Sequence, residues 1–358
     1  MNNKIKFEVS PFPKDSAKTE YEALNNLLNS LRKERLPDDP PLPVEETISN
    51  LQTIPPFVDL QIWVVRLPGQ NDIIAMGDSV IMQTPENQHL QQFEISVEAG
   101  YRRQGIGTHM LGLVAAEANK KNRRLLMTNT SDRIPGGDAF MKSIGAQAGM
   151  QAHTNQLALQ DLNPDLVTDW LERSKKNSLE FELGLWMGPY PEAQLEDIAR
   201  LSDIANQQPI GDLDIEDMHT SPEQLREMEN NLFSRGGQRW TFFIRERSGG
   251  KFAGFTETIW NPNRPEVVRQ ELTGVFPEFR NKGFGRWLKA AMLEKILSER
   301  PQVKFIRTGN ADSNVAMLKI NNELGFKPYS ADTIWQVELH QVESYLSSAN
   351  SPATHKDN

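Results

Sequence analysis

A basic, glycine-containing segment occurs twice in this chain, each time where a strand-like run gives way to an amphipathic helix. Both copies carry the pattern Arg-x-x-Gly-x-Gly, from Arg102 to Gly107 and again from Arg280 to Gly285. Glycine lets the backbone approach a ligand closely and adopt positive φ angles. The helix that starts there directs unpaired N–H groups and a partial positive charge towards whatever binds above it. This combination suits a diphosphate group.

Other phosphate-binding loops explain the pattern less well. The dinucleotide-binding fingerprint Gly-x-Gly-x-x-Gly needs a third glycine, and Met110 and Leu288 stand at that position. A Walker loop is excluded because neither Gly-Lys-Ser nor Gly-Lys-Thr follows. The alternative is a strand-to-helix turn that needs glycine for its geometry alone. Two copies in the same context argue instead for a duplicated phosphate-binding domain.

The elements around the two loops follow one order. Strands are expected near 58–66, 73–82 and 91–97 before the first loop, and near 240–247, 252–260 and 267–276 before the second. The helix after each loop has apolar residues at every fourth position: Ile106, Met110, Val114 and Ala118, and then Phe284, Leu288, Met292 and Ile296. Strands follow these helices near 125–130 and 303–308. The second half continues with a helix near 314–324 and a strand near 333–339.

The two loops resemble the phosphate-binding loop of the GNAT superfamily of acetyltransferases. The stretch from Asn314 to Leu324-Gly325-Phe326 is similar to the closing helix of that family. The resemblance covers roughly residues 58–160 and 180–340, and two-domain members such as mycothiol synthase are the nearest comparison. It implies an α/β fold (an α+β mixed sheet) with two tandem GNAT-like domains, each a mixed, mostly antiparallel sheet flanked by helices. It also implies an acyl-CoA ligand whose pyrophosphate rests on the loop.

Four segments are expected along the chain. These are an N-terminal GNAT-like domain over 1–160, a connecting helix over 161–178, a C-terminal GNAT domain over 179–345 and a disordered tail over 346–358. The first domain closes with Ile144-Gly145-Ala146, where the second has Leu-Gly-Phe. We therefore expect catalysis in the C-terminal domain and a binding or structural role for the N-terminal copy.

The loop chemistry and the resemblance together assign the residues that bind the cofactor. In the first copy they are Val97, Arg102, Arg103, Gln104, Gly105, Ile106 and Gly107, and in the second Val275, Arg280, Asn281, Lys282, Gly283, Phe284, Gly285 and Arg286. The cationic side chains would contact phosphate oxygens. In the family, the strand near Val275 supplies a backbone contact to the acyl carbonyl. Asn310 and Asn314 match positions that contact the pantetheine arm.

Acyl transfer to an amine also needs a base that takes the amine proton. Glu271 on the strand before the second loop and Glu257 on the neighbouring strand are the candidates, although either could be a solvent-facing or structurally paired carboxylate. The family often has a tyrosine acid four residues before the Gly-Phe turn. Asn321 and Met141 stand at that position here, and an asparagine cannot act as a general acid. The thiol would then leave as a thiolate or take a proton from water.

The acidic segment from Gly211 to Asp217 is a candidate acceptor-binding region. Its carboxylates could attract an ammonium group. Alternatively, Asp217 or Ser221 caps the next helix and the other carboxylates are solvated.

Composition narrows the class of protein. The chain has 358 residues, no cysteine and a net charge of −9, which disfavours a nucleic-acid partner and an acyl-cysteine intermediate. No apolar run is long enough for a membrane helix, the N-terminus lacks the apolar core of a signal peptide, and no histidine spacing indicates a metal site. We predict a cytoplasmic N-acetyltransferase that moves an acetyl group from acetyl-CoA to a small-molecule primary amine in a ternary complex. The alternatives are a non-catalytic acyl-CoA-binding sensor or scaffold and, more weakly, a protein N-acetyltransferase.

Overall fold

The computed structural model describes residues 5–350, which form two compact units. Within that range, unit 1 comprises residues 5–150, 212–216 and 332–350, and unit 2 comprises residues 151–211 and 217–331. The expected domains, 1–160 and 179–345, were sequential. The compact units instead interleave along the chain, because each contains a strand that lies in the other half of the sequence.

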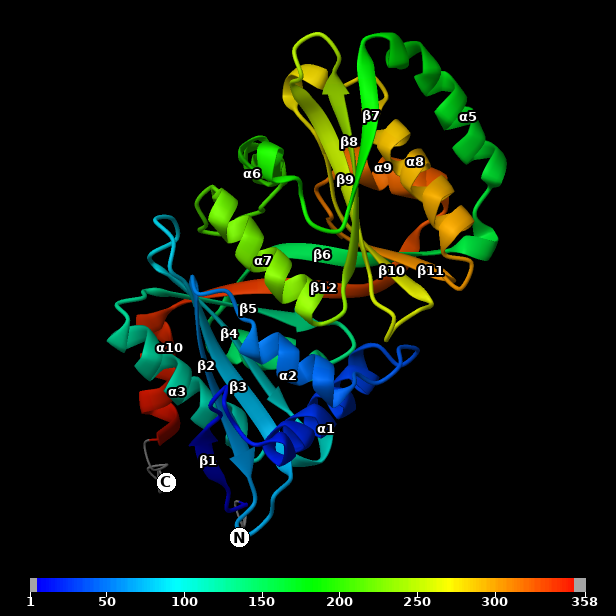
Figure 1. Cartoon of the computed structure of the whole chain (residues 1–358). Coiled ribbons are helices and arrows are strands. Elements are labelled where there is room, and N and C mark those ends of the chain that lie inside the picture. The colour runs from blue at the N-terminus through cyan, green and yellow to red at the C-terminus, as the bar shows by residue number, and fades with distance from the viewer. Residues whose placement is uncertain (1–4, 351–358) are drawn as a thin grey trace, which may run out of the picture. The chain divides into compact units, whose positions relative to one another are not determined.

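Unit 1 contains a mixed sheet with the strand order β1-β2-β3-β4-β5-β12 (Figure 1). All neighbours in it are antiparallel except β4 and β5, which are parallel. The strands are β1 (Glu8–Pro11), β2 (Val58–Arg66), β3 (Ile73–Met82), β4 (Leu90–Val97), β5 (Leu125–Ser131) and β12 (Lys327–Glu338). The helices are α1 (Lys18–Arg35), α2 (Val44–Gln52), α3 (Ile106–Lys120), α4 (Pro135–Ser143) and α10 (Leu339–Asn350).

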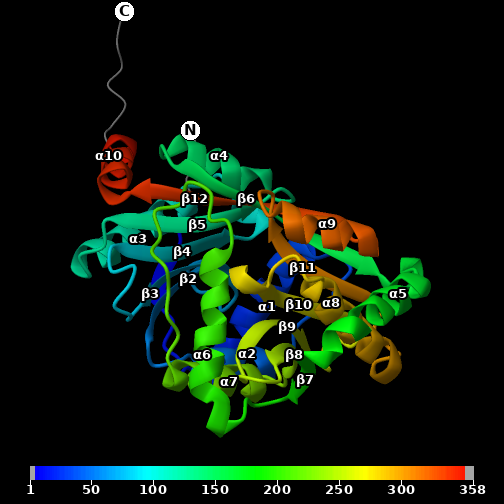
Figure 2. The same cartoon turned by 90° about the horizontal axis from the view of Figure 1, so that it is seen from above.

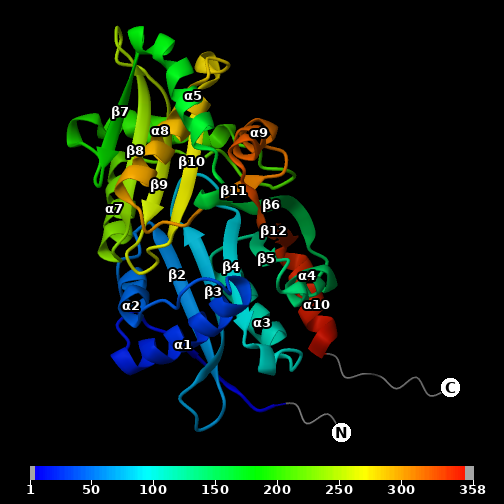
Figure 3. The ribbon, with the colours of Figure 1, turned by 90° about the vertical axis from the view of Figure 1, so that its right-hand side faces the viewer.

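The side chains of β2 alternate between the two faces of the sheet and pack against different helices on each face. Ile62 and Val64 pack in one core with α1, whereas Val65 packs with α3 in another. Successive residues of a strand point to opposite faces, so the apolar run in β2 serves both layers. α10 lies beside α3 (Figures 1 and 3).

Unit 2 repeats this plan with the strand order β7-β8-β9-β10-β11-β6, in which only β10 and β11 are parallel. The strands are β6 (Gln147–Ala158), β7 (Phe181–Met187), β8 (Gln238–Glu246), β9 (Phe252–Trp260), β10 (Val267–Val275) and β11 (Phe305–Ala311). The helices are α5 (Pro164–Ser174), α6 (Leu195–Ser202), α7 (Pro222–Ser234), α8 (Phe284–Glu299) and α9 (Val315–Leu324). Phe243 packs in the core that contains α6 residues, and Ile244 packs with α8. α5 and α8 lie side by side (Figures 1 and 2).

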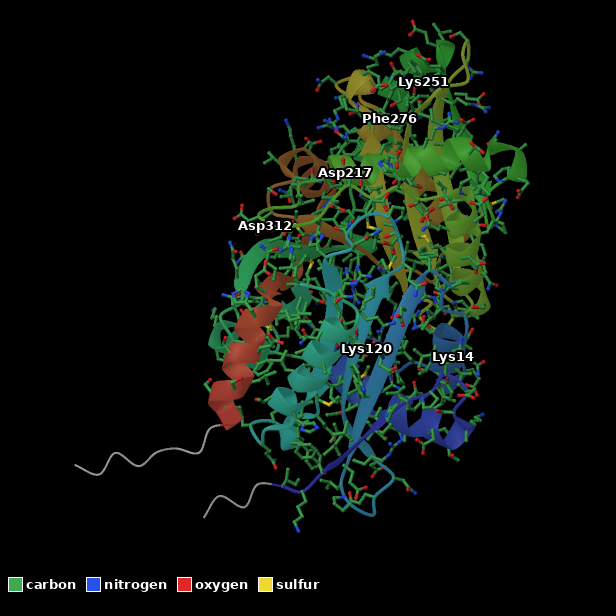
Figure 4. All side chains as sticks on the ribbon, turned by 90° about the vertical axis from the view of Figure 1, so that its left-hand side faces the viewer. Lys14, Lys120, Asp217, Lys251, Phe276 and Asp312 are labelled. Carbon is green, nitrogen blue, oxygen red and sulfur yellow. The ribbon has the colours of Figure 1, made fainter. Side chains whose placement is uncertain are left out.

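The last strand of each sheet comes from the other half of the sequence. In unit 1, residues 332–338 of β12 pair with β5, and in unit 2, residues 152–158 of β6 pair with β11. His153 of β6 also meets Asp312, which is labelled in Figure 4, with 2.5 Å between Nδ1 and Oδ1. Neither sheet is therefore complete within one half of the sequence.

The expected disordered tail is wrong for residues 346–350, because α10 continues to Asn350. Val342 is fully buried, and Tyr345 and Leu346 pack partly buried in the core that includes α3 residues. These apolar residues recur at helical spacing, but the polar residues between them made the segment resemble a disordered tail. Residues 351–358 lie outside the described residues.

Candidate functional site

The two glycine loops have the same backbone geometry. Arg103 and Gly105 have φ angles of 62° and 87°, and Asn281 and Gly283 have 64° and 84°. A Cβ atom placed on Gly105 or Gly283 would meet nothing within 4 Å, so the space above each loop is open. The first bond of each following helix is accepted by the second of these residues, at 3.0 Å by the Gly105 carbonyl and 3.1 Å by the Gly283 carbonyl. The three residues between each glycine and that first donor have N–H groups without a partner inside the helix, and these N–H groups are available to an anion.

The first arginine of each pattern holds the loop to the preceding strand. Arg102 Nε donates to the Val97 carbonyl at 2.9 Å, and Arg280 Nε donates to the Val275 carbonyl at 3.2 Å. The guanidinium of Arg102 is also bound by both carboxylate oxygens of Glu34. These two arginines were expected to bind the cofactor, and the structure places a loop-fixing role on each of them.

The other cationic side chains predicted to bind the cofactor differ in the protein groups that contact them. Arg286 is engaged by both oxygens of Glu323, at 2.9 and 2.7 Å. The Lys282 ammonium lies over the rings of Phe181 and Phe279, 5.1 and 5.6 Å from their centroids. Such a cation–π contact leaves the ammonium hydrogen-bond donors available.

In both units the parallel strand pair diverges before the loop. Pairing of β4 with β5 ends at Gln92 and Met127, although the strands continue to Val97 and Ser131. Pairing of β10 with β11 ends in the same way, at Gln270 and Thr308. Beyond these points each strand stays paired with its antiparallel neighbour, but the backbone groups that face the gap have lost their partner in the parallel ladder. A ligand between the strands can take the place of that partner.

In unit 1 this wedge opens into a cavity of about 510 Å³, within the range typical of small-molecule sites. Its walls are residues 93–97 of β4, residues 128–131 of β5, the first glycine loop, α4, the end of α1 and Tyr345 of α10. The predicted residues that line it are Val97, Arg102, Arg103, Gly105, Ile106 and Gly107. Gln104 instead donates to the Gly100 carbonyl at 3.2 Å.

Two carboxylates that sequence reasoning missed lie on neighbouring strands, and one of them, Glu94, lines this cavity. Asp78 on β3 and Glu94 on β4 are cross-strand partners, and the Glu94 N–H donates to Asp78 Oδ1 at 2.8 Å. Burial raises the pKa of Asp78 to about 7; the Glu94 charge adds to this rise, and the Glu94 N–H opposes it. Glu94 lines the cavity, and its Oε1 accepts from Ser96 Oγ at 2.8 Å.

The register shows that Asp78 is the counterpart of Glu257. Asp78 lies three residues after Ala75, the partner of Val97, and Glu257 lies three residues after Gly254, the partner of Val275. This equivalence was readable in principle from the repeat, since both loops are preceded by two paired strands. The sequence offset that aligns the two loops pairs Asp78 with Thr256, one residue before Glu257, and this shift concealed the equivalence.

Glu257 is set in a network of buried polar groups in unit 2. Its Oε2 accepts from Tyr190 Oη at 2.5 Å and from Thr241 Oγ1 at 2.9 Å, and its side chain is 17% exposed. Burial raises the pKa of Glu257, while the charge of Arg239 opposes that rise. Burial also raises the pKa of Tyr190.

Glu271, the second predicted base, lies where the pairing of β10 with β9 shifts register between Gln270 and Thr273. Its negative charge adds to the raised pKa of Glu257, so the structure brings the two candidate bases near each other. Glu271 also forms an ion pair with Arg269 at 3.1 Å. Each unit thus places two carboxylates on the two strands before its loop.

In unit 2, the two residues expected to contact pantetheine form hydrogen bonds with other protein side chains. Asn314 Nδ2 donates to Gln208 Oε1 at 2.6 Å, and Asn310 Oδ1 accepts from Asn321 Nδ2 at 2.7 Å. A Cβ atom on Gly274 of β10 would lie 2.0 Å from Ile204 Cγ2. The segment from Ile204 to Gln208 therefore reaches from β10 to the start of α9.

The acidic segment expected near the acceptor has structural partners. Asp214 pairs with Arg124 at 2.6 Å, and the Asn87 N–H donates to Glu216 Oε2 at 2.6 Å. Ser221 caps α7 and forms a capping box with Gln224. These contacts favour the structural interpretation of the segment.

Two further observations concern the class of site. No helix between residues 5 and 350 is long and apolar enough to cross a membrane. In the same described range, no group of three histidine or acidic side chains is arranged to hold a metal ion.

No family model and no curated protein matches this chain. Solved structures do match it, and two of them illustrate the similarity. A tandem GNAT protein from the clavulanic acid biosynthesis pathway is similar with a TM-score of 0.75 and 21% identity, over 93% of this chain and 99% of that one. A GCN5-related N-acetyltransferase from Sphaerobacter thermophilus has a TM-score of 0.65 and 11% identity, over 93% and 96% of the two chains. At these identities the similarity establishes the fold.

Proposed function

We propose that this chain, which has the tandem GNAT fold, transfers an acetyl group from acetyl-CoA to a primary amine of a small molecule, and that unit 1 carries out the reaction. The observation that carries this proposal is the cavity of unit 1. It joins an anion-binding loop, a pair of diverging strands and the Glu94 carboxylate in one space of about 510 Å³, and Asp78 accepts a hydrogen bond from the Glu94 N–H.

Each part of acetyl-CoA has a matching part of that cavity. The N–H groups that follow Gly105, together with the Arg103 side chain, would hold the pyrophosphate. The pantetheine amides would bond to the unpaired backbone between β4 and β5. Phe93, Ile95 and Phe140 supply an apolar wall for the acyl end.

The reaction would proceed by direct attack. The Asp78–Glu94 pair takes a proton from the ammonium form of the acceptor, a role suited to a carboxyl whose pKa lies at about 7. The neutral amine then attacks the thioester carbonyl and an N–C bond forms. The nitrogen passes its second proton to water, and the C–S bond breaks. CoA leaves as a thiolate and takes a proton from water. No cysteine is present to carry the acyl group, which favours direct transfer with both substrates bound together.

Unit 2 has the same loop and its own carboxylates, and Glu257 and Glu271 stay our proposed bases for acyl transfer there. Its acceptor side differs, because Ile204 covers Gly274 and Gln208 bonds Asn314. For that reason we assign the principal activity to unit 1, although sequence alone favoured unit 2.

The proposal is tested by CoA release from acetyl-CoA across a panel of small amines, detected with a thiol reagent. The protein has no cysteine and adds no background to this assay. Amine-dependent release supports acetyl transfer. Silence across the panel, with acetyl-CoA binding demonstrated separately by calorimetry, supports the non-catalytic acyl-CoA sensor instead.

A further inference from the structure

The acceptor end of the unit 1 cavity is lined by two opposite charges. Arg35 at the end of α1 and Glu94 on β4 both contribute to the wall, with 3.6 Å between Arg35 Nη1 and Glu94 Oε1. Their side chains are 39% and 44% exposed. A solvated pair at this separation contributes little stability, so a ligand can part it at small cost.

The position of Arg35 is fixed by neighbouring bonds from α1. Glu34 binds the Arg102 guanidinium, and Ser30 Oγ donates to Glu98 Oε1 at 3.3 Å. Arg133 Nη1 donates to the Arg35 carbonyl at 2.8 Å. These contacts hold the end of α1 against β4 and the glycine loop. The backbone of Arg35 therefore stands at a defined place relative to the acyl end of the cavity.

The guanidinium of Arg35 is also uncommitted apart from Glu94. Among residues 5–350, Glu94 is the one carboxylate that forms an ion pair with it. In unit 2 the cation beside Glu257 is Arg239, which is buried, paired with Glu229 and stacked 3.5 Å from the centroid of Tyr190. Unit 2 also has an exposed cation, Arg269, which pairs with Glu271, but in unit 1 the exposed cation Arg35 lines the cavity.

We propose that the acceptor of unit 1 is a zwitterionic amine of the α-amino acid type. Its ammonium group would bind to Glu94, and its carboxylate would bind the Arg35 guanidinium through two hydrogen bonds. The ligand replaces each half of the existing pair with a group of the same charge, so neither Arg35 nor Glu94 is left without a partner. This inference rests on the proposed acetyl transfer, and it names the chemical class of the amine.

The test compares each proteinogenic amino acid with its own decarboxylated amine as acceptor, with rates expressed per neutral amine. Loss of a charge-assisted contact predicts a kcat/KM about 10- to 100-fold lower for the decarboxylated amine. Arg35→Gln should remove most of this preference by raising KM for amino acids more than KM for decarboxylated amines. Arg35→Lys should restore part of it. Arg173→Gln, an exposed arginine of α5, is the matched control and should keep the full preference.

The outcomes separate this inference from the activity on which it rests. Equal kcat/KM for amino acids and decarboxylated amines would overturn the proposal that the acceptor is a zwitterion, and it would leave the proposed acetyl transfer intact. A preference that persists in folded Arg35→Gln would remove Arg35 from the site. Silence with every acceptor would overturn the proposed function itself, and this inference with it.

Discussion

Replacing Asp78 with asparagine should make the protein more stable and less active. Burial and the nearby Glu94 charge raise the pKa of Asp78 from 3.8 to about 7. That is about three pKa units, or about 4 kcal/mol at 1.36 kcal/mol per unit. The side chain keeps partial contact with solvent, so we expect a gain of about 2–4 kcal/mol from Asp78→Asn at alkaline pH.

The sign follows from proton binding. Between pH 4 and 7 the folded protein holds a proton on Asp78 that the unfolded chain has lost, so wild-type stability falls as pH rises through this range. Above pH 7 the folded protein carries the full free-energy cost of burying the ionised Asp78 carboxylate. The asparagine variant has no charge to bury, so its advantage should grow from pH 4 to 7 and then stay constant.

Activity should change in the opposite direction. Removing a general base costs about 10²- to 10⁴-fold in rate. Urea unfolding at pH 5 and pH 8 measures the stability change, and CoA release measures turnover, with the exposed Asp72→Asn as control. An Asp78→Asn variant that turns over at the wild-type rate, or that is less stable at pH 8, would refute the role of Asp78.

Three other predictions follow from particular contacts. Lys289 is 2% exposed and burial lowers its pKa to about 7. Lys289→Met should therefore stabilise the protein by about 3–5 kcal/mol below pH 7 in urea unfolding, with the gain shrinking as pH rises towards 10.5. Glu257→Gln combined with Glu271→Gln should leave most amine-dependent CoA release intact, and loss of turnover would place catalysis in unit 2. A fragment of residues 1–178 lacks β12 and should show no cooperative thermal transition by circular dichroism, whereas a cooperative transition would contradict the need for that strand.

Local signals predicted much of the fold. The bounds of β2, β3 and β9 were as expected, because alternating apolar and β-branched residues define a strand within its own sequence. The glycine loops were also recognisable, since a positive φ at Gly105 and Gly283 restricts residue choice directly. Helix α4 and strand β6 were not anticipated, and their sequences carry few apolar residues at regular spacing.

The exchange of β6 and β12 could not be read from the sequence. Which partner a strand chooses depends on tertiary packing, and the sequence pattern of β12 would fit either sheet. The same limit applies to the site. Asn310 and Asn314 were identified by their positions, but the bond from Asn314 to Gln208 joins segments that lie 106 residues apart in the chain.

The central claim is that acetyl transfer occurs in unit 1, and matched substitutions in the two loops test it most directly. Gly105→Glu and Gly283→Glu place the same charge and the same backbone strain at equivalent positions, with φ angles of 87° and 84°. Each glutamate would repel the pyrophosphate from its own loop. Amine-dependent CoA release should be abolished by Gly105→Glu and retained by Gly283→Glu. The reverse result, with both variants folded, would contradict the account and place the reaction in unit 2.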